Sequence, residues 1–220
     1  MRSLGPTVGM RVGGISAQPI EGDRTRAGSL HRVLPAVRSR LPGALRDITT
    51  AVLHDRYLQL LILFTIAGLA LRLWQLGTAS FWLDEALTSY YSRHPFSEIW
   101  GLGTDGSNPP TFYWIEHIML MFGSGEALLR LVPALAGTCT IPVFYLLGRD
   151  FHNRTTGLVA AVLLTVSPFH ISYSQEARPY TVFLFVFSLA LLMYLRARTS
   201  GSVSTWLLFG VFSGLACWMH

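Results

Sequence analysis

Long apolar stretches, separated by short joints rich in arginine, constrain this chain more than any other feature of its sequence. A helix rises ~1.5 Å per residue, so about 20 apolar residues cross the ~30 Å hydrocarbon core of a bilayer. Candidate spans lie at residues 58–76, 127–148, 157–172, 179–196 and 203–220. Because no water in that core can satisfy backbone groups, such stretches fold as helices. The sequence therefore predicts an all-α fold, a polytopic transmembrane helix bundle of about five spans.

Charged residues are few and unevenly placed. They make up 13% of the chain, against about a quarter in soluble domains. Nine of the 17 basic residues, all of them Arg, precede Tyr57, where only four acids accompany them. Basic residues that are not arranged with aromatic residues on a folded face do not indicate a nucleic-acid partner. Residues 1–56, rich in Gly, Pro, Ser and Arg, are expected to form a disordered basic tail.

Arginines also mark the joints between spans, and they predict the topology. Arg149 and Arg154 flank the second joint, and Arg196 and Arg198 flank the fourth. With five spans, these joints and the tail share one side, which the positive-inside rule assigns to the cytoplasm. We therefore expect a multi-pass protein of the cell membrane with a cytoplasmic N-terminus. The last stretch reaches His220 without a polar flank, so we expect the N-terminal part of a longer protein.

The segment 77–125 is acidic and aromatic, and its apolar stretches are too short to cross a bilayer. We expect an external loop in which residues 81–92 and 110–122 form juxtamembrane helices. Asp84 and Glu85 follow the first span closely. They could sit in the first turn of a helix, where acids favour the helix dipole. They could instead supply a general base, or a base together with a ligand for a divalent metal.

Two further polar clusters could contribute to a site. The first contains Asp105, in a predicted turn that ends with two prolines, and Tyr113 and His117, which follow that turn. The second lies between the third and fourth spans and contains Gln175, Glu176, Arg178 and Tyr180. Arg178 could pair with Glu176 in a tight turn. It could instead clamp the phosphate of a lipid, because the planar guanidinium suits phosphate geometry.

Five motifs follow one another in this order: WLDE, NPPTFYW, EALLRLVPALAG, VFYLLGRDF and SPFHISYSQEARPY. Together they resemble membrane glycosyltransferases of the GT-C fold, related to protein O-mannosyltransferases and aminoarabinose transferases (glycosyltransferase family 39-like). The resemblance covers about residues 72–220. It implies that residues 57–220 are the N-terminal part of a GT-C transmembrane domain. It also implies a polyprenyl-phosphate sugar donor and an acceptor protein, lipid or glycan on the non-cytoplasmic face.

The resemblance also assigns roles to the residues of these motifs. Asp84 matches the family's acid in the first external loop, a base or metal ligand, and Glu85 completes its Asp-Glu pair. Arg178 is the candidate for the donor phosphate, and the other residues of the two polar clusters are candidates for substrate binding. Arg130 matches the family's Arg-Leu-Pro element, although Val132 is inserted in it here.

A polytopic transporter or lipid flippase is the alternative function. Transporters tend to place ionisable residues near the bilayer midplane, in broken helices. Here the predicted spans are nearly free of such residues, and the acids gather in one loop. That distribution favours an enzyme. The cofactor stays open, with a divalent metal as the candidate.

Overall fold

The computed structural model describes residues 54–104 and 109–219, and the described part of the chain is helical without strands. The helices are α2 (Arg56–Leu73), α3 (Leu83–Ser92), α4 (Phe96–Thr104), α5 (Thr111–Leu120), α6 (Glu126–Leu129), α7 (Leu131–Phe151), α8 (Arg154–Val166), α9 (Pro168–Ser174), α10 (Tyr180–Ser200) and α11 (Val203–Cys217). The predicted all-α fold is confirmed. Asp105 and nearly all of the predicted tail lie outside the described residues.

Long apolar helices make this an integral membrane protein. Among the described residues, three helical segments are long and apolar enough to cross a bilayer: α2, α6 with α7, and α10. The pair α8 and α9 passes the same test as one span bent by 61°. The apolar helix α11 has only 15 residues and is short for a span. The described residues thus contain three candidate spans, or four with the bent pair, where the sequence predicted about five.

The bend between α8 and α9 falls at Ser167 and Pro168. Proline has no N–H to donate to the preceding turn, so α8 ends before it. The hydroxyl of Ser167 accepts a hydrogen bond from the backbone N–H of His170 at 3.4 Å and caps α9. A predicted single span over residues 157–172 is therefore two helices.

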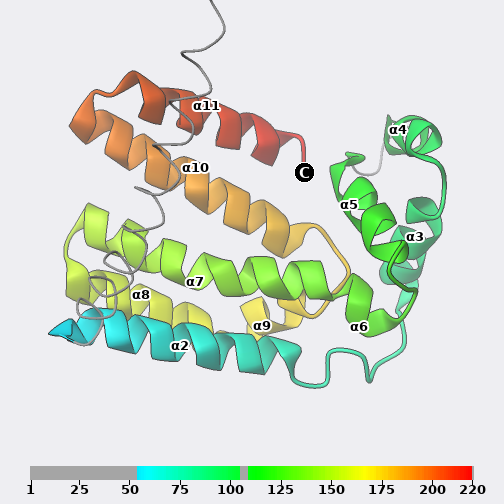
Figure 1. Ribbon diagram of the computed structural model, residues 1–220, viewed down its shortest axis with the longest axis horizontal. Coiled ribbons are helices and arrows are strands. Elements are labelled where there is room, and N and C mark those ends of the chain that lie inside the picture. Colours follow the sequence, from blue (N-terminus) through cyan, green and yellow to red (C-terminus); the bar gives the residue numbers. More distant parts are fainter. Residues whose placement is uncertain (1–53, 105–108, 220) are drawn as a thin grey trace, which may run out of the picture. The chain divides into compact units, whose positions relative to one another are not determined.

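The long helices pack around α7, which contacts α2, α8 and α10 (Figure 1). Gly148 of α7 and Gly157 of α8 bring the two backbones together, because a side chain at either position would meet backbone atoms of the other helix. Nearby, Leu61, Ile141 and Ala161 form a buried apolar cluster between α2, α7 and α8. These contacts fix the relative positions of the helix ends that carry the polar groups.

The short helices α3, α4, α5 and α6 gather beyond one end of the long helices (Figure 1). Helices α3 and α5 lie inside the two predicted juxtamembrane segments, whereas α4 was not predicted. The arginine-rich joints, between α7 and α8 and between α10 and α11, lie at the opposite end. The bundle therefore has an acidic, aromatic end and a basic end.

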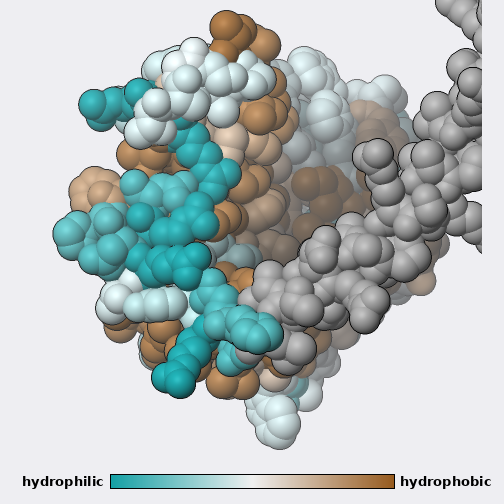
Figure 2. Space-filling model, turned by 60° about the vertical axis from the view of Figure 1, so that its left-hand side comes forward, coloured by the Kyte–Doolittle hydropathy of each residue, from teal (hydrophilic) through white to brown (hydrophobic). Residues whose placement is uncertain are grey.

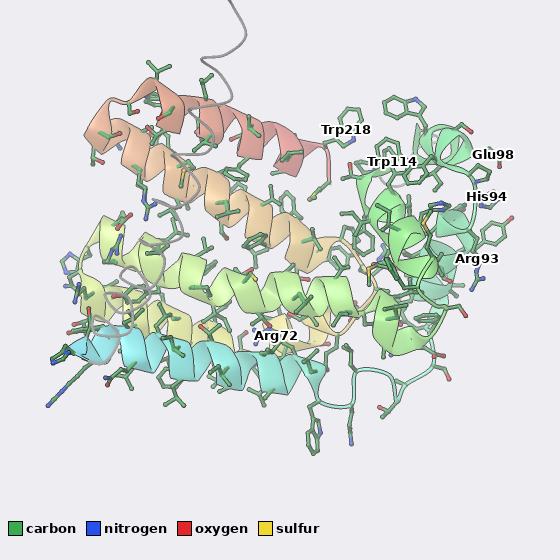
Figure 3. All side chains as sticks on the ribbon, in the orientation of Figure 1. Arg72, Arg93, His94, Glu98, Trp114 and Trp218 are labelled. Carbon is green, nitrogen blue, oxygen red and sulfur yellow. The ribbon has the colours of Figure 1, made fainter. Side chains whose placement is uncertain are left out.

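Arg72, near the end of α2, does not snorkel to the surface as an isolated span would require. It is 0% exposed and lies between α2 and α9 (Figure 3). Its guanidinium donates to the carbonyls of Gly68 at 2.9 Å and Leu164 at 3.2 Å. Its Nη2 also lies 2.7 Å from Nδ1 of His170, which must accept because arginine has only donors. Arg72 thus ties α2 to both parts of the bent pair.

Candidate active site

Glu85 lies in the first turn of α3 and is 1% exposed. Its Oε1 accepts from Nε of Arg130 at 2.8 Å, and its Oε2 accepts from Nη2 at 2.7 Å. Such a two-pronged pair is the strongest arrangement of an arginine and a carboxylate. The backbone N–H groups of Ala177 at 2.8 Å and Trp82 at 3.4 Å also donate to this carboxylate. Both oxygens of Glu85 are therefore fully engaged.

The other N–H groups of Arg130 donate hydrogen bonds to the backbone that follows α2. Its Nη1 donates to the carbonyls of Leu76 at 3.0 Å and Ala79 at 2.8 Å. Burial would raise the pKa of Glu85, but hydrogen bonds from Arg130 and Ala177 outweigh burial and lower that pKa below its ordinary value. The carboxylate therefore stays ionised, and the Glu85–Arg130 pair joins α3, the start of α7 and the segment before α10.

Asp84, in the same helical turn, has a different environment. Its side chain is 36% exposed, and its Oδ2 lies 3.5 Å from Nη2 of Arg178, whose side chain is 11% exposed. Arg178 also donates weakly to the hydroxyl of Tyr180 at 3.4 Å and lies over that ring, 5.5 Å from its centroid. The buried Nε of Arg178 has no hydrogen-bond partner among the described residues. The Asp84–Arg178 pair is therefore loose and open, and Nε of Arg178 is left, within the described structure, as an unused hydrogen-bond donor.

Glu176 lies in the segment between α9 and α10. Its backbone carbonyl accepts from the N–H of Arg178 at 2.8 Å and closes a turn. The side chains of Glu176 and Arg178 form no ion pair within 4 Å in the described structure, because Arg178 turns to Asp84 instead. Burial, and then the nearby charge of Glu85, raise the pKa of Glu176 above its ordinary value.

The side chain of Gln175 forms hydrogen bonds with the end of α2. Its Nε2 donates to the carbonyl of Trp74 at 2.8 Å and to those of Leu71 and Arg72 at 3.3 Å each. Those carbonyls belong to the last turn of the helix, where they lack partners within the helix. The contacts of Gln175 therefore cap a span.

Tyr113 and His117 lie on α5 and pack against the neighbouring short helices. Tyr113 is buried, and its ring centroid lies 5.7 Å from that of Tyr91 on α3. Nδ1 of His117 lies 2.8 Å from the carbonyl oxygen of Ser92, and its ring packs edge-on against Phe96 at 4.6 Å. The contacts of Tyr113 and His117 therefore hold α3, α4 and α5 together.

Of the predicted site residues, the structure brings together Asp84, Glu85, Glu176, Arg178 and Tyr180. These five residues form the candidate site.

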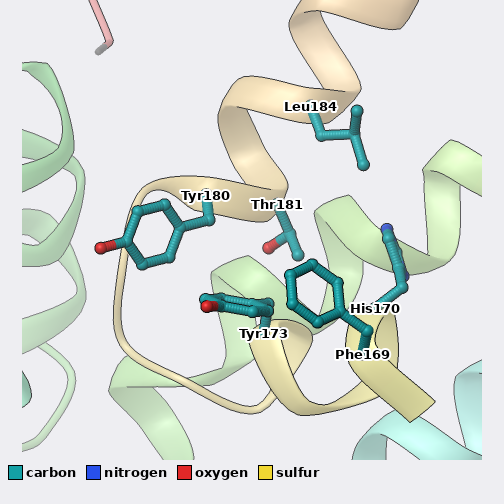
Figure 4. A pocket seen from close by; sticks show the side chains of 6 residues that line it. All are labelled: Phe169, His170, Tyr173, Tyr180, Thr181 and Leu184. Carbon is teal, nitrogen blue, oxygen red and sulfur yellow. The ribbon is translucent and has the colours of Figure 1, made fainter. Parts of the chain in front are cut away.

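A cavity of about 340 Å³ adjoins this cluster through Tyr180. It is lined by Phe169, His170, Tyr173, Tyr180, Thr181 and Leu184. Figure 4 shows α9 supplying one wall and α10 the other. The ring of Tyr173 meets that of Tyr180 at 90°, with centroids 5.1 Å apart. A mostly apolar cavity beside a cation suits a ligand with an apolar body and an anionic head.

A metal at Asp84 and Glu85 does not fit this geometry. Both oxygens of Glu85 accept from Arg130, and a coordinating carboxylate would have to give up that pair. The described residues contain no group of three or more His, Cys, Asp or Glu side chains that could hold a metal ion.

Two groups at this end of the bundle escaped the sequence reasoning. Arg130 was matched to a family element but not to Glu85, although an arginine within an apolar stretch signals a buried partner. Glu116 of α5 is 0% exposed, and neither carboxylate oxygen has a hydrogen-bond partner in the described structure. Burial raises its pKa to about 9. An acid inside the apolar run TFYWIEHIML was the signal that could have identified it.

A family match and one characterised relative point to the same family. Residues 107–220, just over half of the chain, match the family described as dolichyl-phosphate-mannose-protein mannosyltransferase. Protein O-mannosyl-transferase 1 of Rattus norvegicus is 28% identical over 185 residues, covering 71% of this chain and 24% of that protein. An uncharacterized protein of Aquifex aeolicus (strain VF5) is 29% identical over 117 residues, covering 52% of this chain and 23% of that protein.

The chain thus spans about a quarter of the length of the curated relatives it matches. No solved structure matches it significantly. The family match covers the segment with Arg130, Glu176 and Arg178, whereas Asp84 and Glu85 precede it. Because the match extends over more than half of the sequence, it decides the assignment. The chain belongs to the dolichyl-phosphate-mannose-protein mannosyltransferase family.

Proposed function

We propose that this chain carries the base of a membrane glycosyltransferase, which moves a sugar from a polyprenyl-phosphate donor to an acceptor hydroxyl on the non-cytoplasmic face. The acceptor is a protein, a lipid or a glycan. Family membership supports the reaction class. One observation carries the assignment of the site: Asp84 and Arg178 form an open pair at 3.5 Å, beside a neighbouring pair that is closed.

In this mechanism Asp84 acts as the general base. The acceptor oxygen attacks the anomeric carbon of the sugar, and its proton passes to the Asp84 carboxylate. The bond between that carbon and the phosphate oxygen breaks, and its electrons leave with the phosphate. A positioned base typically contributes about 10²–10⁴-fold to the rate. Glu85 is a positioning residue, because its bond to Arg130 fixes the turn of α3 that presents Asp84.

Arg178 binds the donor phosphate in this proposal. Its Nε has no partner among the described residues, and its bond to Asp84 is long enough to be exchanged for a phosphate oxygen. Charge that develops on the leaving phosphate is stabilised by a donor already in position. The cavity behind Tyr180, about 340 Å³, takes the part of the lipid chain nearest the phosphate.

Enzyme and flippase can be separated by measuring sugar transfer and lipid movement on the same membranes. In membranes that contain the full-length enzyme, we expect transfer from a labelled polyprenyl-phosphate mannose to acceptor, and its loss in Asp84→Asn. Glu98→Gln is the matched control, because this exposed acid of α4 belongs to the same loop. Movement of the lipid across the bilayer without any sugar transfer would support the flippase function and contradict the enzymatic one.

The proposed topology places Asp84 outside the cell and the arginine-rich joints inside. It can be tested after replacing the exposed Cys139 and Cys217. A cysteine at the exposed position of Tyr90 should react with a membrane-impermeant reagent in intact cells. A cysteine in place of the exposed Thr199, at the opposite end, should react only after permeabilisation. The reverse pattern would contradict the orientation.

A further inference from the structure

The basic end of the bundle contains a second cavity, far from the candidate active site. It measures about 260 Å³ and lies between the last turns of α7 and α10. Its walls are formed by Asp150, Phe151, Leu195, Arg198 and Thr199. Figure 2, in which this end comes forward, shows hydrophilic residues gathered between hydrophobic flanks. We propose that this cavity binds the phosphodiester headgroup of an anionic membrane lipid.

The charges around the cavity favour an anion. Oδ1 of Asp150 accepts from Nε of Arg149 at 2.8 Å, and Oδ2 accepts from Nε of Arg196 at 2.9 Å. One carboxylate therefore serves two arginines. Arg198, in the cavity wall, has no acidic partner within 4 Å among the described residues, and its guanidinium lies only over the ring of Tyr194, 5.8 Å away. Three guanidinium groups against one carboxylate leave an excess of two positive charges.

The apolar wall distinguishes a lipid from a free phosphate ion. Phe151, the last residue of α7, is 78% exposed, and Leu195 lines the cavity beside it. Both lie at the ends of segments that are long enough to cross a bilayer, where headgroups and acyl chains meet. Inorganic phosphate would use only the cationic wall. A phospholipid would place its phosphate at Arg198 and the start of its acyl chains against Phe151.

Charge complementarity argues against the chain's own N-terminal segment as the occupant. The sequence before Tyr57 contains nine arginines and four acids, so its net charge has the same sign as the cavity. One of those acids, Asp55, is already paired with Arg154 at 2.8 Å. An anionic lipid has the opposite charge and is abundant in the leaflet that basic flanks prefer.

The test measures lipid retention by native mass spectrometry on the purified protein, with phosphatidylglycerol and phosphatidylcholine as probes. We expect phosphatidylglycerol to be retained preferentially. Arg198→Gln should weaken its binding about fivefold, the contribution of one arginine near anionic lipid. Arg154→Gln is the matched control: it removes the same charge from the same end, but outside the cavity, and should change binding less than about twofold. Equal losses in both variants would mean diffuse surface attraction and overturn the site.

A second arm separates the lipid from a free ion. Phe151→Ser removes the apolar wall at an exposed position, so the fold should tolerate it. It should weaken phosphatidylglycerol binding and leave any affinity for inorganic phosphate unchanged. If millimolar inorganic phosphate displaces the lipid, and Phe151→Ser binds lipid as the wild type does, the cavity takes free anions and the lipid proposal is wrong.

Discussion

Two acid–arginine pairs start from consecutive residues of α3, and they differ in almost every physical respect. Glu85 and Arg130 meet at 2.7 Å, with side chains 1% and 5% exposed. Asp84 and Arg178 meet at 3.5 Å, with side chains 36% and 11% exposed. Consecutive residues of an α-helix point about 100° apart, because 3.6 residues complete a turn. One carboxylate therefore faces the interior of the protein and the other faces its surface.

Burial explains why only one pair is saturated. Removing a charge from water costs several kcal/mol, and the cost is recovered only when the geometry and the remaining hydrogen bonds are good. Glu85 meets this condition with Arg130 and two backbone N–H groups. Asp84 keeps contact with water, so it needs no such complement. A saturated pair holds structure, whereas an open pair can exchange its partner for a substrate.

The largest effect should come from breaking the closed pair. Arg130→Ala leaves the Glu85 carboxylate buried and unpaired, which should reduce the free energy of unfolding by about 3–5 kcal/mol. Thermal unfolding in detergent measures the loss. Replacing Glu85 and Arg130 together by Met should recover most of it, because no charge then stays buried. An Arg130→Ala protein that unfolds at the wild-type temperature would refute the structural role.

Asp84→Asn should show the opposite combination. It keeps the shape of the side chain and removes the base, so turnover should fall about 10²-fold or more. Unfolding temperature should stay close to that of the wild type, because the Asp84 side chain is partly exposed and weakly paired. Sugar transfer and thermal unfolding are measured on the same preparation. Normal turnover would return Asp84 to the role of a helix-terminus acid.

Arg178→Lys should have a smaller effect, mainly on the KM for the donor, with kcat falling too if the contact tightens as the phosphate leaves. Lysine keeps the charge but loses the planar fork, so the KM for the polyprenyl-phosphate donor should rise about tenfold, the value of one charged hydrogen bond. Acceptor KM should not change. A donor titration of the variant beside Arg93→Lys, an exposed arginine in the segment 77–125, provides the control. Unchanged donor dependence in Arg178→Lys would leave the phosphate role unsupported.

Glu116 sharpens the comparison as a buried acid with no arginine, and its effect, counted per pH unit, should be the smallest. Its pKa rises from 4.5 to about 9 on burial, so between these values the folded state binds one more proton than the unfolded state. Stability should therefore fall as pH rises through this window, by at most about 1.4 kcal/mol per pH unit. Glu116→Gln should flatten the profile of unfolding temperature between pH 5 and 8. If the profiles of Glu116→Gln and the wild type stay parallel, Glu116 is not held in its neutral form in the folded protein.

Much of the fold could be predicted because hydrophobicity alone locates helices in a membrane. The starts and ends of α2, α7 and α10 fall within a few residues of the predicted spans, apart from the last turn of α10. Helix α4 was missed because its nine residues, Phe96–Thr104, are too few to give a clear apolar period. The bend before α9 was signalled by Pro168, but length and hydropathy outweighed it in the prediction of one span.

The candidate site was only partly accessible from the sequence. Asp84 and Glu85 looked equivalent as neighbours, since burial decides between them and burial depends on the packing of α3. Arg130 lies 45 residues from Glu85, and a contact at that separation has no periodic signal. The contact of Asp84 with Arg178 spans 94 residues and arises only when the segment before α10 folds back onto α3.

The hydrogen bond from Ala177 to Glu85 also sets an order of events during synthesis. Ala177 is translated 92 residues after Glu85, which takes roughly 5–18 s at ordinary elongation rates of about 5–20 residues per second. Throughout that interval α3 cannot complete its contacts, however quickly the first span inserts. The acidic turn therefore reaches its final shape only after α9 has left the ribosome.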